Sequence, residues 1–341
     1  MSLGDFDYEL PVAAIAQAPP PTRDGARLLV VDRGRGTLDD RRLIELPALL
    51  RRGDCLVVND SRVIPARVLA EDATRRPVEL LFLEEETPSR WRALVRPGRR
   101  CRAGVTLSAG GCQLTVVGVR DDGARVIERA DGAIADLLAA HGLPPLPPYI
   151  ARHAKPASED WERYQTVYAR TPGSVAAPTA GLHLSETLLA RLRAQGVEIH
   201  ALTLHVGPAT FRPITVEDVE AHVLPPERAI VPAATAVAVN AARAQGRRVV
   251  AVGTTVTRTL ESAAAEDGRV HALDGMASLY IRPGHRFRVV DALLTNFHLP
   301  RSSLLVLVSA FAGRERILGA YRHAVAAGYR FYSYGDATLL T

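Results

Sequence analysis

Cysteine and lysine are scarce in this 341-residue chain, and each scarcity argues against a class of chemistry. Cys55, Cys101 and Cys112 are odd in number and form no C-x-x-C pair, which disfavours a disulfide framework or a structural zinc site. Lys155 is the single lysine among 42 basic residues, so any Schiff-base mechanism would depend on that one side chain. It lies in the polar run RHAKPASED, which makes such a mechanism a poor interpretation.

Long apolar runs are also missing. No stretch of eighteen apolar residues exists, so no segment is expected to span a membrane. The acidic start MSLGDFDYEL lacks the basic and then apolar segments of a secretory signal. With 47% hydrophobic and 23% charged residues, we expect a cytoplasmic globular protein, and the length favours two domains.

Familiar catalytic motifs are absent as well. The chain has no G-x-x-x-x-G-K-[ST] loop, no G-x-G-x-x-G after a strand and no G-x-S-x-G elbow. The absence of these motifs therefore disfavours nucleotide hydrolysis, dinucleotide redox chemistry and serine hydrolysis. No two histidines have H-x-x-x-H or H-E-x-x-H spacing, so we predict no metal site.

Hydrophobic patterning divides the chain into two kinds of structure. Residues 27–32 and 55–58 read as strands and residues 39–50 as a helix. Short β-rich runs separated by turns fill residues 62 to 146. From residue 174 onward, helices at 185–195, 233–245 and 314–327 alternate with strands, including VEIHALTLHV and the late run YRFYSY. The predicted fold is an α/β protein whose discontinuous sheet domain (1–61 and 150–341) is interrupted by a small antiparallel β-barrel domain (62–149).

The stretch VVAVGTTVTRTLE, residues 249–261, joins a buried strand to a polar helix start. Gly253 makes the turn, and a hydroxyl of Thr254 or Thr255 is expected to cap the helix. Helical spacing sets Arg258 and Glu261 on the same side as these threonines. Such a turn presents amide groups to an anionic ligand, although an ordinary capped helix with an exposed ion pair explains these residues equally well.

Polar blocks recur where α/β folds place ligands, at strand ends and the turns after them. Besides residues 254–261, these blocks are 59–62, 178–183, 205–212, 295–301 and 333–336. Each block alone is also compatible with ordinary turn chemistry. Their candidate ligand-binding and acid–base residues are Asp60, Thr179, His183, His205, Asn296, His298 and Asp336.

Arginines are concentrated in the segment SRWRALVRPGRRCRAG. The cluster is either a solvated face of the barrel or a phosphate-binding surface for a nucleic acid. The candidate nucleic-acid contacts, here and in the polar blocks, are Arg62, Arg96, Arg99, Arg100, Arg212 and Arg301.

Ten stretches together resemble the S-adenosylmethionine:tRNA ribosyltransferase-isomerases of queuosine biosynthesis. They include VVNDSRVIPAR, ALVRPGRR, AAPTAGLH, TLHVGPATFRP, VAVGTTVTRTLESAA, TNFHLPRSSLLVLVSAFAG and GYRFYSYGDA, in the family's order from residue 7 to residue 337. The chain departs from the family pattern at Leu184, usually Phe, at Pro225, usually a second His, and at Pro208-Ala209, usually the end of a G-x-G. Nearly the whole chain is covered.

The resemblance implies an α/β domain interrupted by a β-barrel and a reaction on two substrates. The ribosyl part of S-adenosylmethionine, a co-substrate rather than a catalytic cofactor, is transferred to 7-aminomethyl-7-deazaguanine at the tRNA wobble position and isomerised. Adenine and methionine leave. The implied partners are this tRNA and S-adenosylmethionine, with the protein a monomer or weak oligomer.

Residue roles follow as hypotheses from that resemblance. The sulfonium charge would be offset by Asp60, Asp336 or Glu261, and protons carried by His183, His205 or His298. The helix start at Thr254 and Thr255, with Arg258, would hold the methionyl carboxylate, and Arg62, Arg212 and Arg301 would hold phosphate or substrate. Two alternatives stay open: an S-adenosylmethionine-dependent tRNA methyltransferase, and a non-catalytic tRNA-binding relative, which the changes around Pro208 and Pro225 favour.

Overall fold

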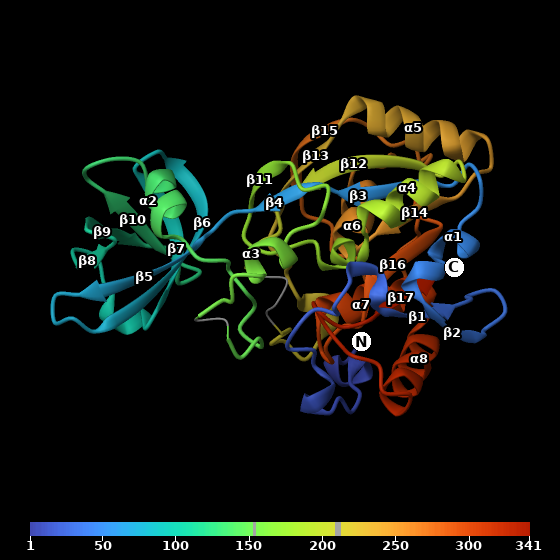
Figure 1. Cartoon of the computed structure of the whole chain (residues 1–341), viewed down its shortest axis with the longest axis horizontal. Coiled ribbons are helices and arrows are strands. Elements are labelled where there is room, and N and C mark those ends of the chain that lie inside the picture. Colours follow the sequence, from blue (N-terminus) through green and yellow to red (C-terminus); the bar gives the residue numbers. More distant parts are fainter. Residues whose placement is uncertain (153–154, 209–212) are drawn as a thin grey trace. The chain divides into compact units, whose positions relative to one another are not determined.

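The chain folds into two units, each with its own core (Figure 1). The computed structural model describes residues 1–152, 155–208 and 213–341. One unit contains Met1–Ser61, Gln165–Thr171 and Ala177–Thr341, and the other contains Arg62–Tyr164 and Pro172–Ala176. The division predicted from the sequence returns to the first unit at residue 150, whereas the segments between 150 and 176 alternate between the two.

The first unit is built on a nine-stranded mixed sheet. Its order is β15 (Leu273–Ala277), β13 (Glu227–Val231), β12 (Glu198–Leu204), β3 (Cys55–Asn59), β14 (Val249–Val252), β16 (Ala292–Asn296), β17 (Ala337–Leu340), β1 (Arg27–Val31) and β2 (Leu38–Arg42). The four central strands β12, β3, β14 and β16 are parallel, whereas β17 runs antiparallel to β16. Their near-continuous apolar sequences are typical of strands covered on both faces.

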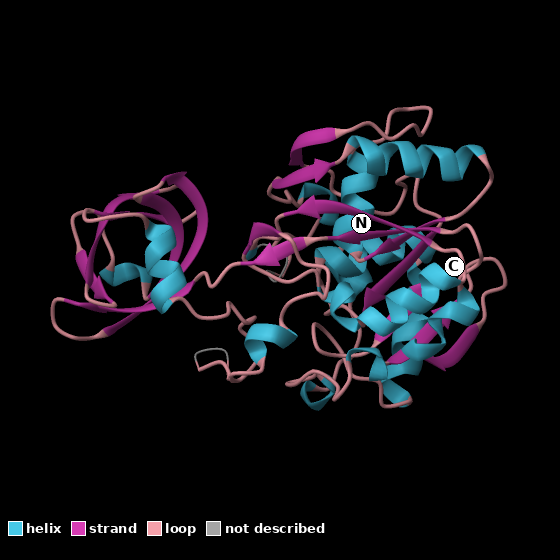
Figure 2. Cartoon of the chain, turned by 45° about the horizontal axis from the view of Figure 1, so that its top comes forward, coloured by secondary structure: helices cyan, strands magenta, loops and turns pink. Residues whose placement is uncertain are grey.

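Helices cover both faces of this sheet (Figure 2). Because side chains alternate along a strand, Cys55 and Val57 pack on one face and Leu56 and Val58 on the other. The first face is covered by α5 (Ala233–Ala244), α6 (Thr254–Ser262), α7 (Ser303–Ala312) and α8 (Arg314–Ala326), and the second by α1 (Leu46–Leu49) and α4 (Glu186–Ala194). The sheet is therefore the middle layer of three.

The second unit is a closed antiparallel barrel of six strands. The strands are β5 (Arg67–Asp72), β6 (Pro77–Thr87), β7 (Arg90–Arg96), β8 (Thr106–Ala109), β9 (Cys112–Val119) and β10 (Arg125–Arg129), in the order β10-β7-β6-β5-β8-β9. Alternate side chains such as Val78, Leu80 and Phe82 fill its core together with α2 (Ile134–His141). The predicted fold class, an α/β sheet with an inserted antiparallel barrel, is confirmed.

Three further short elements of the described chain are β4 (Ser61–Val63), which pairs with β11 (Thr171–Ser174), and α3 (Asp160–Arg163), besides several 3-10 turns. The helices predicted at 185–195, 233–245 and 314–327 correspond to α4, α5 and α8 within one or two residues. Ser185 caps α4 through its hydroxyl, which accepts from the Leu188 amide at 3.0 Å. These predictions are confirmed.

Two local predictions are wrong. Residues 39–50 are not one helix: the charged run Leu38–Arg42 pairs with β1 as an exposed edge strand, and the helical part is a 3-10 turn at Leu43–Glu45 followed by α1. The run YRFYSY is not a strand either, since β17 starts at Ala337. Its Phe331 instead packs 4.8 Å from the Phe297 ring, so side-chain packing overrides the strand propensity of aromatic residues.

Candidate active site

The polar blocks meet because four parallel strands end at one edge of the sheet. β12, β3, β14 and β16 end at Leu204, Asn59, Val252 and Asn296. Asn296 is paired with Ala337, the first residue of the antiparallel strand β17, so the segment before Ala337 reaches the same edge. Topology thus gathers segments that are far apart in sequence, from Asn59 to the segment before Ala337.

A cavity that is open to solvent lies at this edge, where α/β folds bind small molecules. Five separate segments line it, together with Leu304: Ala177–Ala180, Val206, Gly253–Thr255, Thr295, Asn296 and His298, and Tyr332–Ser333. The sequence-predicted residues that line it are Thr179, Thr254, Thr255, Asn296 and His298. Val206, Leu304 and Tyr332 were missed as individual residues, because apolar or aromatic side chains beside a polar block carry no signal of their own.

Helix α6 points its amino end at this cavity without a capping side chain. Gly253 is the N-cap residue at φ 95° and ψ 155°, and the predicted cap by Thr254 or Thr255 is wrong. The Thr257 and Thr259 hydroxyls instead donate back to the carbonyls of Gly253 and Thr255 at 3.2 and 2.9 Å. A helix start whose amides no side chain caps suits an anionic group.

The amide of Asn296 is held in one orientation. Its Nδ2 donates to the Tyr332 carbonyl at 3.1 Å and to His183 Nε2 at 3.0 Å. An amide nitrogen only donates, so His183 accepts through Nε2 and carries its proton on Nδ1. Asn296 Oδ1 is buried without a partner among the described residues, which leaves it as an acceptor for a ligand donor in the cavity.

His183 and His298 are neutral imidazoles. Burial lowers the pKa of His183 to about 4, with a smaller contribution from the positive charge of Arg330, and lowers the pKa of His298 to about 3. His298 Nε2 shares a hydrogen bond with the Thr295 hydroxyl at 3.1 Å, and the His298 amide donates to the Tyr321 hydroxyl at 3.1 Å. Neither ring carries a spare proton at neutral pH, so both fit the positioning of other groups better than acid catalysis.

His205 and Asp60 directly follow the neighbouring strands β12 and β3, and neither side chain lines the cavity. Burial, and then the Arg228 charge, lower the pKa of the half-buried His205, while Asp60 opposes the shift. His205 Nδ1 has no hydrogen-bond partner among the described residues. The Asp60 carboxylate is already engaged: it accepts from the Thr203 hydroxyl at 2.6 Å and pairs with Arg170 at 2.7 Å. Its negative charge is therefore largely balanced within the protein.

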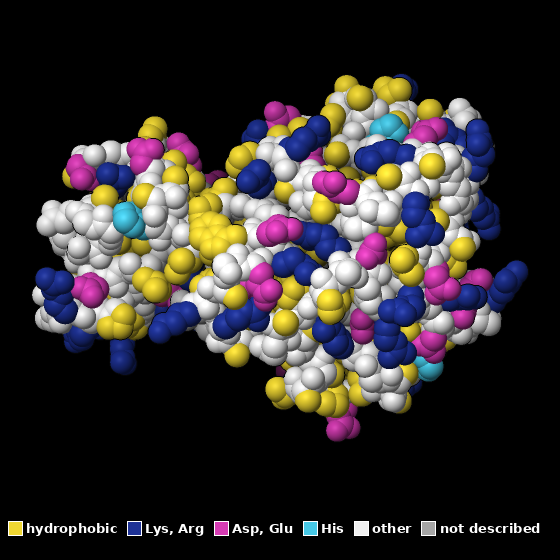
Figure 3. All heavy atoms as spheres, in the orientation of Figure 1, with side chains coloured by type: hydrophobic (Ala, Val, Ile, Leu, Met, Phe, Trp, Pro, Cys, Tyr) yellow, Lys and Arg dark blue, Asp and Glu magenta, His cyan; other side chains and the backbone are white. Residues whose placement is uncertain are grey.

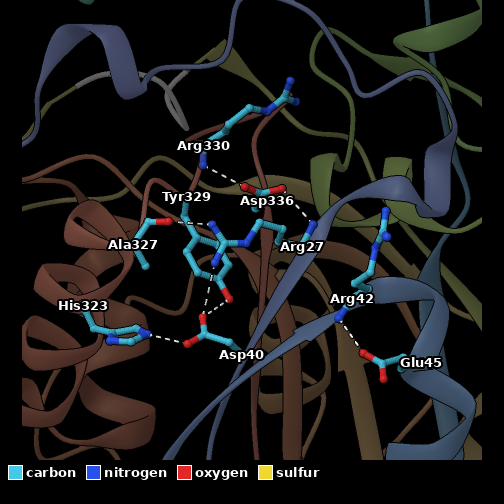
Figure 4. A network of polar contacts seen from close by, with 9 residues as sticks. All are labelled: Arg27, Asp40, Arg42, Glu45, His323, Ala327, Tyr329, Arg330 and Asp336. Atoms are coloured by element: carbon cyan, nitrogen blue, oxygen red, sulfur yellow. Dashed lines mark hydrogen bonds and ion pairs between the residues drawn. The ribbon is translucent and has the colours of Figure 1, made fainter.

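Asp336 holds a loop together and does not line the cavity. Its two oxygens accept from the backbone amides of Arg27 at 2.9 Å and Arg330 at 2.8 Å (Figure 4). In the same view Asp40 receives the His323 imidazole at 2.8 Å and the Tyr329 hydroxyl. This network ties β1 and β2 to the end of α8, and that bracing accounts for the Asp336 carboxylate.

Glu261 and Arg258 leave helix α6 in different directions. Glu261 accepts three backbone amides, from Arg288, Val289 and Val290 at 2.9, 3.0 and 3.0 Å, so it fixes a loop. Arg258 forms a buried ion pair with Glu227, Nη2 to Oε2 at 2.6 Å. The sequence pattern placed Arg258 near the ligand but did not reveal Glu227 as its partner, because the two lie 31 positions apart on different elements.

Some of the candidate nucleic-acid arginines already form ion pairs within the protein, whereas others are exposed. Arg62, Arg96 and Arg99 are exposed. Arg100 pairs with Asp72 at 3.3 Å and donates to the Pro77 carbonyl, and Arg301 pairs with Asp7 at 2.8 Å. Arg212 lies outside the described residues. Over the face in Figure 3, basic side chains are interspersed with acidic ones.

Two features of the described residues bear on the class of protein. No group of three His, Cys, Asp or Glu side chains within 1–152, 155–208 and 213–341 is arranged to hold a metal ion. In the same residues no helix is both long and apolar enough to cross a membrane.

A three-layer α/β unit with a cavity at its strand ends, together with a separately folded six-stranded barrel, makes this a two-unit α/β and β-barrel protein. The family model described as "Queuosine biosynthesis protein" matches residues 3–340. The chain therefore belongs to the queuosine biosynthesis family of S-adenosylmethionine:tRNA ribosyltransferase-isomerases.

Curated relatives and a solved structure agree with this assignment. S-adenosylmethionine:tRNA ribosyltransferase-isomerases from Moorella thermoacetica and Anaeromyxobacter dehalogenans are each 53% identical, with 100% of this chain covered and 100% and 99% of theirs. The crystal structure of the S-adenosylmethionine tRNA ribosyltransferase from Thermotoga maritima matches at 34% identity and a TM-score of 0.56, covering 99% of this chain and 100% of that one.

None of the described departures from the family pattern, Leu184, Pro208 and Pro225, lines the first cavity, although Pro208 lies two positions after Val206, which does. Leu184 is fully buried in the core beneath α4, where one apolar side chain replaces another. Pro225 is exposed, and Ala209 lies outside the described residues. His222, which survives from the family pattern, packs edge-on against Tyr280 at 5.3 Å. The placement of Leu184 and Pro225 gives no support to a loss of the ligand site.

Proposed function

We propose that the protein transfers and isomerises the ribosyl moiety of S-adenosylmethionine onto 7-aminomethyl-7-deazaguanine at the wobble position of a tRNA. The product is epoxyqueuosine-tRNA, and adenine and methionine are released. The observation that carries the proposal is the cavity itself: five sequence-distant family motifs line one pocket at the sheet edge, in a chain 53% identical to named enzymes over its full length.

The cavity fits an adenosyl sulfonium substrate in three respects. Asn296 Oδ1 and the Thr255 hydroxyl oxygen are buried and unpaired among the described residues, so each offers a hydrogen bond to the nucleoside or its ribose. The amino end of α6 favours an anionic group. Buried walls such as Ala177, Ala180 and Val206 exclude water, which protects reactive intermediates from hydrolysis.

We assign the role of each side chain from the hydrogen-bonding atoms that remain unpaired within the protein. Asn296, oriented by His183, contacts substrate, and His298 with Thr295 supports the same wall. His205 is the candidate for proton transfer, because it is half-buried, adjoins Val206 in sequence and has a ring nitrogen without a protein partner. Proton removal beside the sulfonium centre is the step that requires such a base.

The proposed tRNA contacts, cellular location and oligomeric state all depend on the proposed ribosyltransferase-isomerase activity. The exposed Arg62, Arg96 and Arg99 are the candidate phosphate contacts for tRNA. The protein is proposed to act in the cytoplasm as a monomer or weak oligomer.

A product assay tests the function. The protein is incubated with S-adenosylmethionine and tRNA carrying the 7-aminomethyl-7-deazaguanine base, and small products are identified by mass spectrometry. Adenine and methionine are expected, and tRNA with guanine at that position is the control that yields neither. S-adenosylhomocysteine and methylated tRNA would establish a methyltransferase, and bound tRNA without any product would establish a non-catalytic relative.

A further inference from the structure

A second cavity of ≈ 360 Å³ adjoins the first and shares Thr254, Thr255 and Leu304 with it. Glu227 of β13 and Arg258 of α6 line it, and each is more than nine-tenths buried. Burial of two opposite charges is costly unless their hydrogen-bonding capacity is met. The hydrogen-bond partners of Glu227 and Arg258 therefore show whether the pair is complete without a ligand in the cavity.

The Glu227–Arg258 pair is joined through one atom from each side chain and leaves bonding capacity unused. Glu227 Oε1 accepts from the Gly207 amide at 2.8 Å, and Oε2 meets only Arg258 Nη2 at 2.6 Å. Arg258 Nη2 also donates to the Ala277 carbonyl at 3.2 Å, whereas Arg258 Nε has no partner among the described residues. Burial raises the pKa of Glu227, while Arg258 opposes that shift.

Two more unpaired groups line the same cavity. The Tyr280 hydroxyl and the Thr255 hydroxyl oxygen are buried and lack partners in the described chain. Leu304 and Leu307 supply apolar wall between them. Buried polar atoms are nearly always satisfied, so the three atoms without partners around this cavity, Arg258 Nε and the Tyr280 and Thr255 hydroxyls, point to a missing polar ligand.

The partly buried pair Asp54–Arg248 at the opposite edge of the sheet shows the contrast. Asp54 Oδ1 and Oδ2 contact Arg248 Nε and Nη2 at 3.1 and 2.5 Å, Asp54 also accepts from the Arg51 amide, and Arg248 also donates to the Leu49 carbonyl. That fork-to-fork pair is complete by itself. The Glu227–Arg258 pair is incomplete and faces a cavity.

We propose that the second cavity binds the α-amino-acid end of the sulfonium substrate, with its carboxylate on Arg258 and its ammonium on Glu227. This inference rests on the proposed function and adds a subsite to it. A zwitterion brings one charge of each sign, so it engages both members of the pair and leaves the net charge of the site unchanged. The methylene chain lies along Leu304 and Leu307, with the Tyr280 hydroxyl completing the polar contacts.

One consequence concerns the reaction geometry. If the amino-acid end occupies the second cavity, the adenosyl part occupies the first, and the sulfur lies near the shared wall of Thr254, Thr255 and Leu304. The two departing groups, adenine and methionine, then leave from different cavities. Methionine alone would be a weak product ligand of the second cavity.

The test compares two ligands with the same adenosyl group. S-adenosylhomocysteine carries the amino-acid end and 5′-methylthioadenosine lacks it, and their Kd values are measured by calorimetry on the full chain with tRNA present. In the wild type we expect S-adenosylhomocysteine to bind about 30-fold tighter, the scale of charge-assisted hydrogen bonds. In the double variant Glu227→Gln/Arg258→Gln the preference should fall to about threefold or less, with the affinity for 5′-methylthioadenosine nearly unchanged.

Two controls keep the result interpretable. The matched variant Asp54→Asn/Arg248→Gln neutralises the complete pair at the far edge and should retain the 30-fold preference. If the site double variant fails to fold, Tyr280→Phe removes only an unpaired hydroxyl and should still reduce the preference about threefold to tenfold. A wild type that binds both ligands equally or binds neither, or a preference unchanged in the site variants, overturns the inference. Adenine release by the wild type is scored separately, so that a failed subsite and a failed function give different results.

Discussion

Asn296 shows how a single side chain at the site is set by its neighbours. Both of its amide hydrogens are used, one on the Tyr332 carbonyl and one on His183 Nε2. The sequence predicted that Asn296 and His183 belong to ligand-binding blocks. It did not predict their contact, because 113 positions separate them and only the fold joins them.

Replacing Asn296 by Leu, of similar size, removes the acceptor that remains for substrate. We expect the apparent KM for S-adenosylmethionine to rise about tenfold or more, since one buried hydrogen bond contributes roughly 1–1.5 kcal/mol. Steady-state kinetics measure this. His183→Gln, which keeps an acceptor near Nε2, should have a smaller effect, and equal kinetics for Asn296→Leu and the wild type would contradict the role of Asn296.

His205 is predicted to act in the chemical step. In His205→Gln we expect kcat to fall about 10²–10⁴-fold, the usual contribution of a general acid or base, with little change in KM. Rates of adenine release at saturating S-adenosylmethionine provide the measurement. A variant with near-normal kcat would transfer the proton-carrying role to another residue.

At the scale of single elements, strand–turn–helix units were the most predictable part of the chain. The periodicity of residues 249–261 predicted β14, the turn at Gly253 and helix α6. The pattern could not show that Gly253 itself is the N-cap or that Glu261 turns to the 288–290 amides, because both depend on tertiary contacts. For the same reason the charged run Leu38–Arg42 looked helical, although pairing with β1 makes it a strand.

Gly253→Ala should destabilise the unit that carries the site. Its φ of 95° with ψ of 155° lies in a region open essentially to glycine, whereas the added Cβ would make only ordinary van der Waals contacts with Ala180 Cβ and Thr255 Oγ1 at 3.5 Å, so the cost is backbone strain. We expect a loss of about 1–3 kcal/mol in urea unfolding. Gly246→Ala is the matched control: its φ is 66°, its added Cβ would meet nothing within 4 Å, and its cost should be about 1 kcal/mol. A cost no greater than that of the control would refute the strained-turn account.

Some arginines of the barrel form ion pairs within the protein, and others are exposed and free to contact phosphate. Arg90 pairs with Glu128 at 2.6 Å, whereas Arg96 and Arg99 are exposed. The double variant Arg96→Ala/Arg99→Ala should bind tRNA more weakly. The slope of log Kd against log salt concentration should also fall by the amount expected for the loss of about two phosphate contacts. Filter-binding titrations at several salt concentrations measure the slope. Arg90→Ala is the paired-charge control, and if it matched the double variant, the barrel surface would contribute only general charge.

At the scale of the whole molecule, two buried neutral histidines make stability depend on pH. Their folded pKa values, about 4 for His183 and about 3 for His298, lie below the unfolded value of about 6.5. The unfolded chain therefore binds protons that the folded chain does not, so stability is full above pH 6.5 and falls as the pH drops towards 4.

Each histidine should cost about 1.4 kcal/mol per pH unit between pH 6 and pH 4.5. Urea unfolding of the wild type at pH 7, 6, 5 and 4.5 gives the total slope. His298→Gln retains a hydrogen-bonding group near Nε2 but cannot titrate, so its slope should be smaller by about 1.4 kcal/mol per pH unit. An unchanged slope would show that His298 titrates normally.

The overall architecture followed from the sequence because the β-rich insert and the alternating helices and strands have different periodicities. The sequence did not predict which residues come together to line the two adjoining cavities, because that depends on the order of the strands in the sheet. Strand β13, which carries Glu227, sits beside β12, and this order brings Glu227 to Arg258 across 31 residues. Periodicity within a segment carries no information about which strands become neighbours.

The most direct test of the central claim is the stoichiometry of one turnover series. Purified protein is incubated with S-adenosylmethionine and precursor-bearing tRNA, and free adenine, methionine and modified tRNA are quantified over time by mass spectrometry. We predict one adenine and one methionine for each tRNA converted to epoxyqueuosine, with no S-adenosylhomocysteine. S-adenosylhomocysteine appearing in step with tRNA modification would contradict the account.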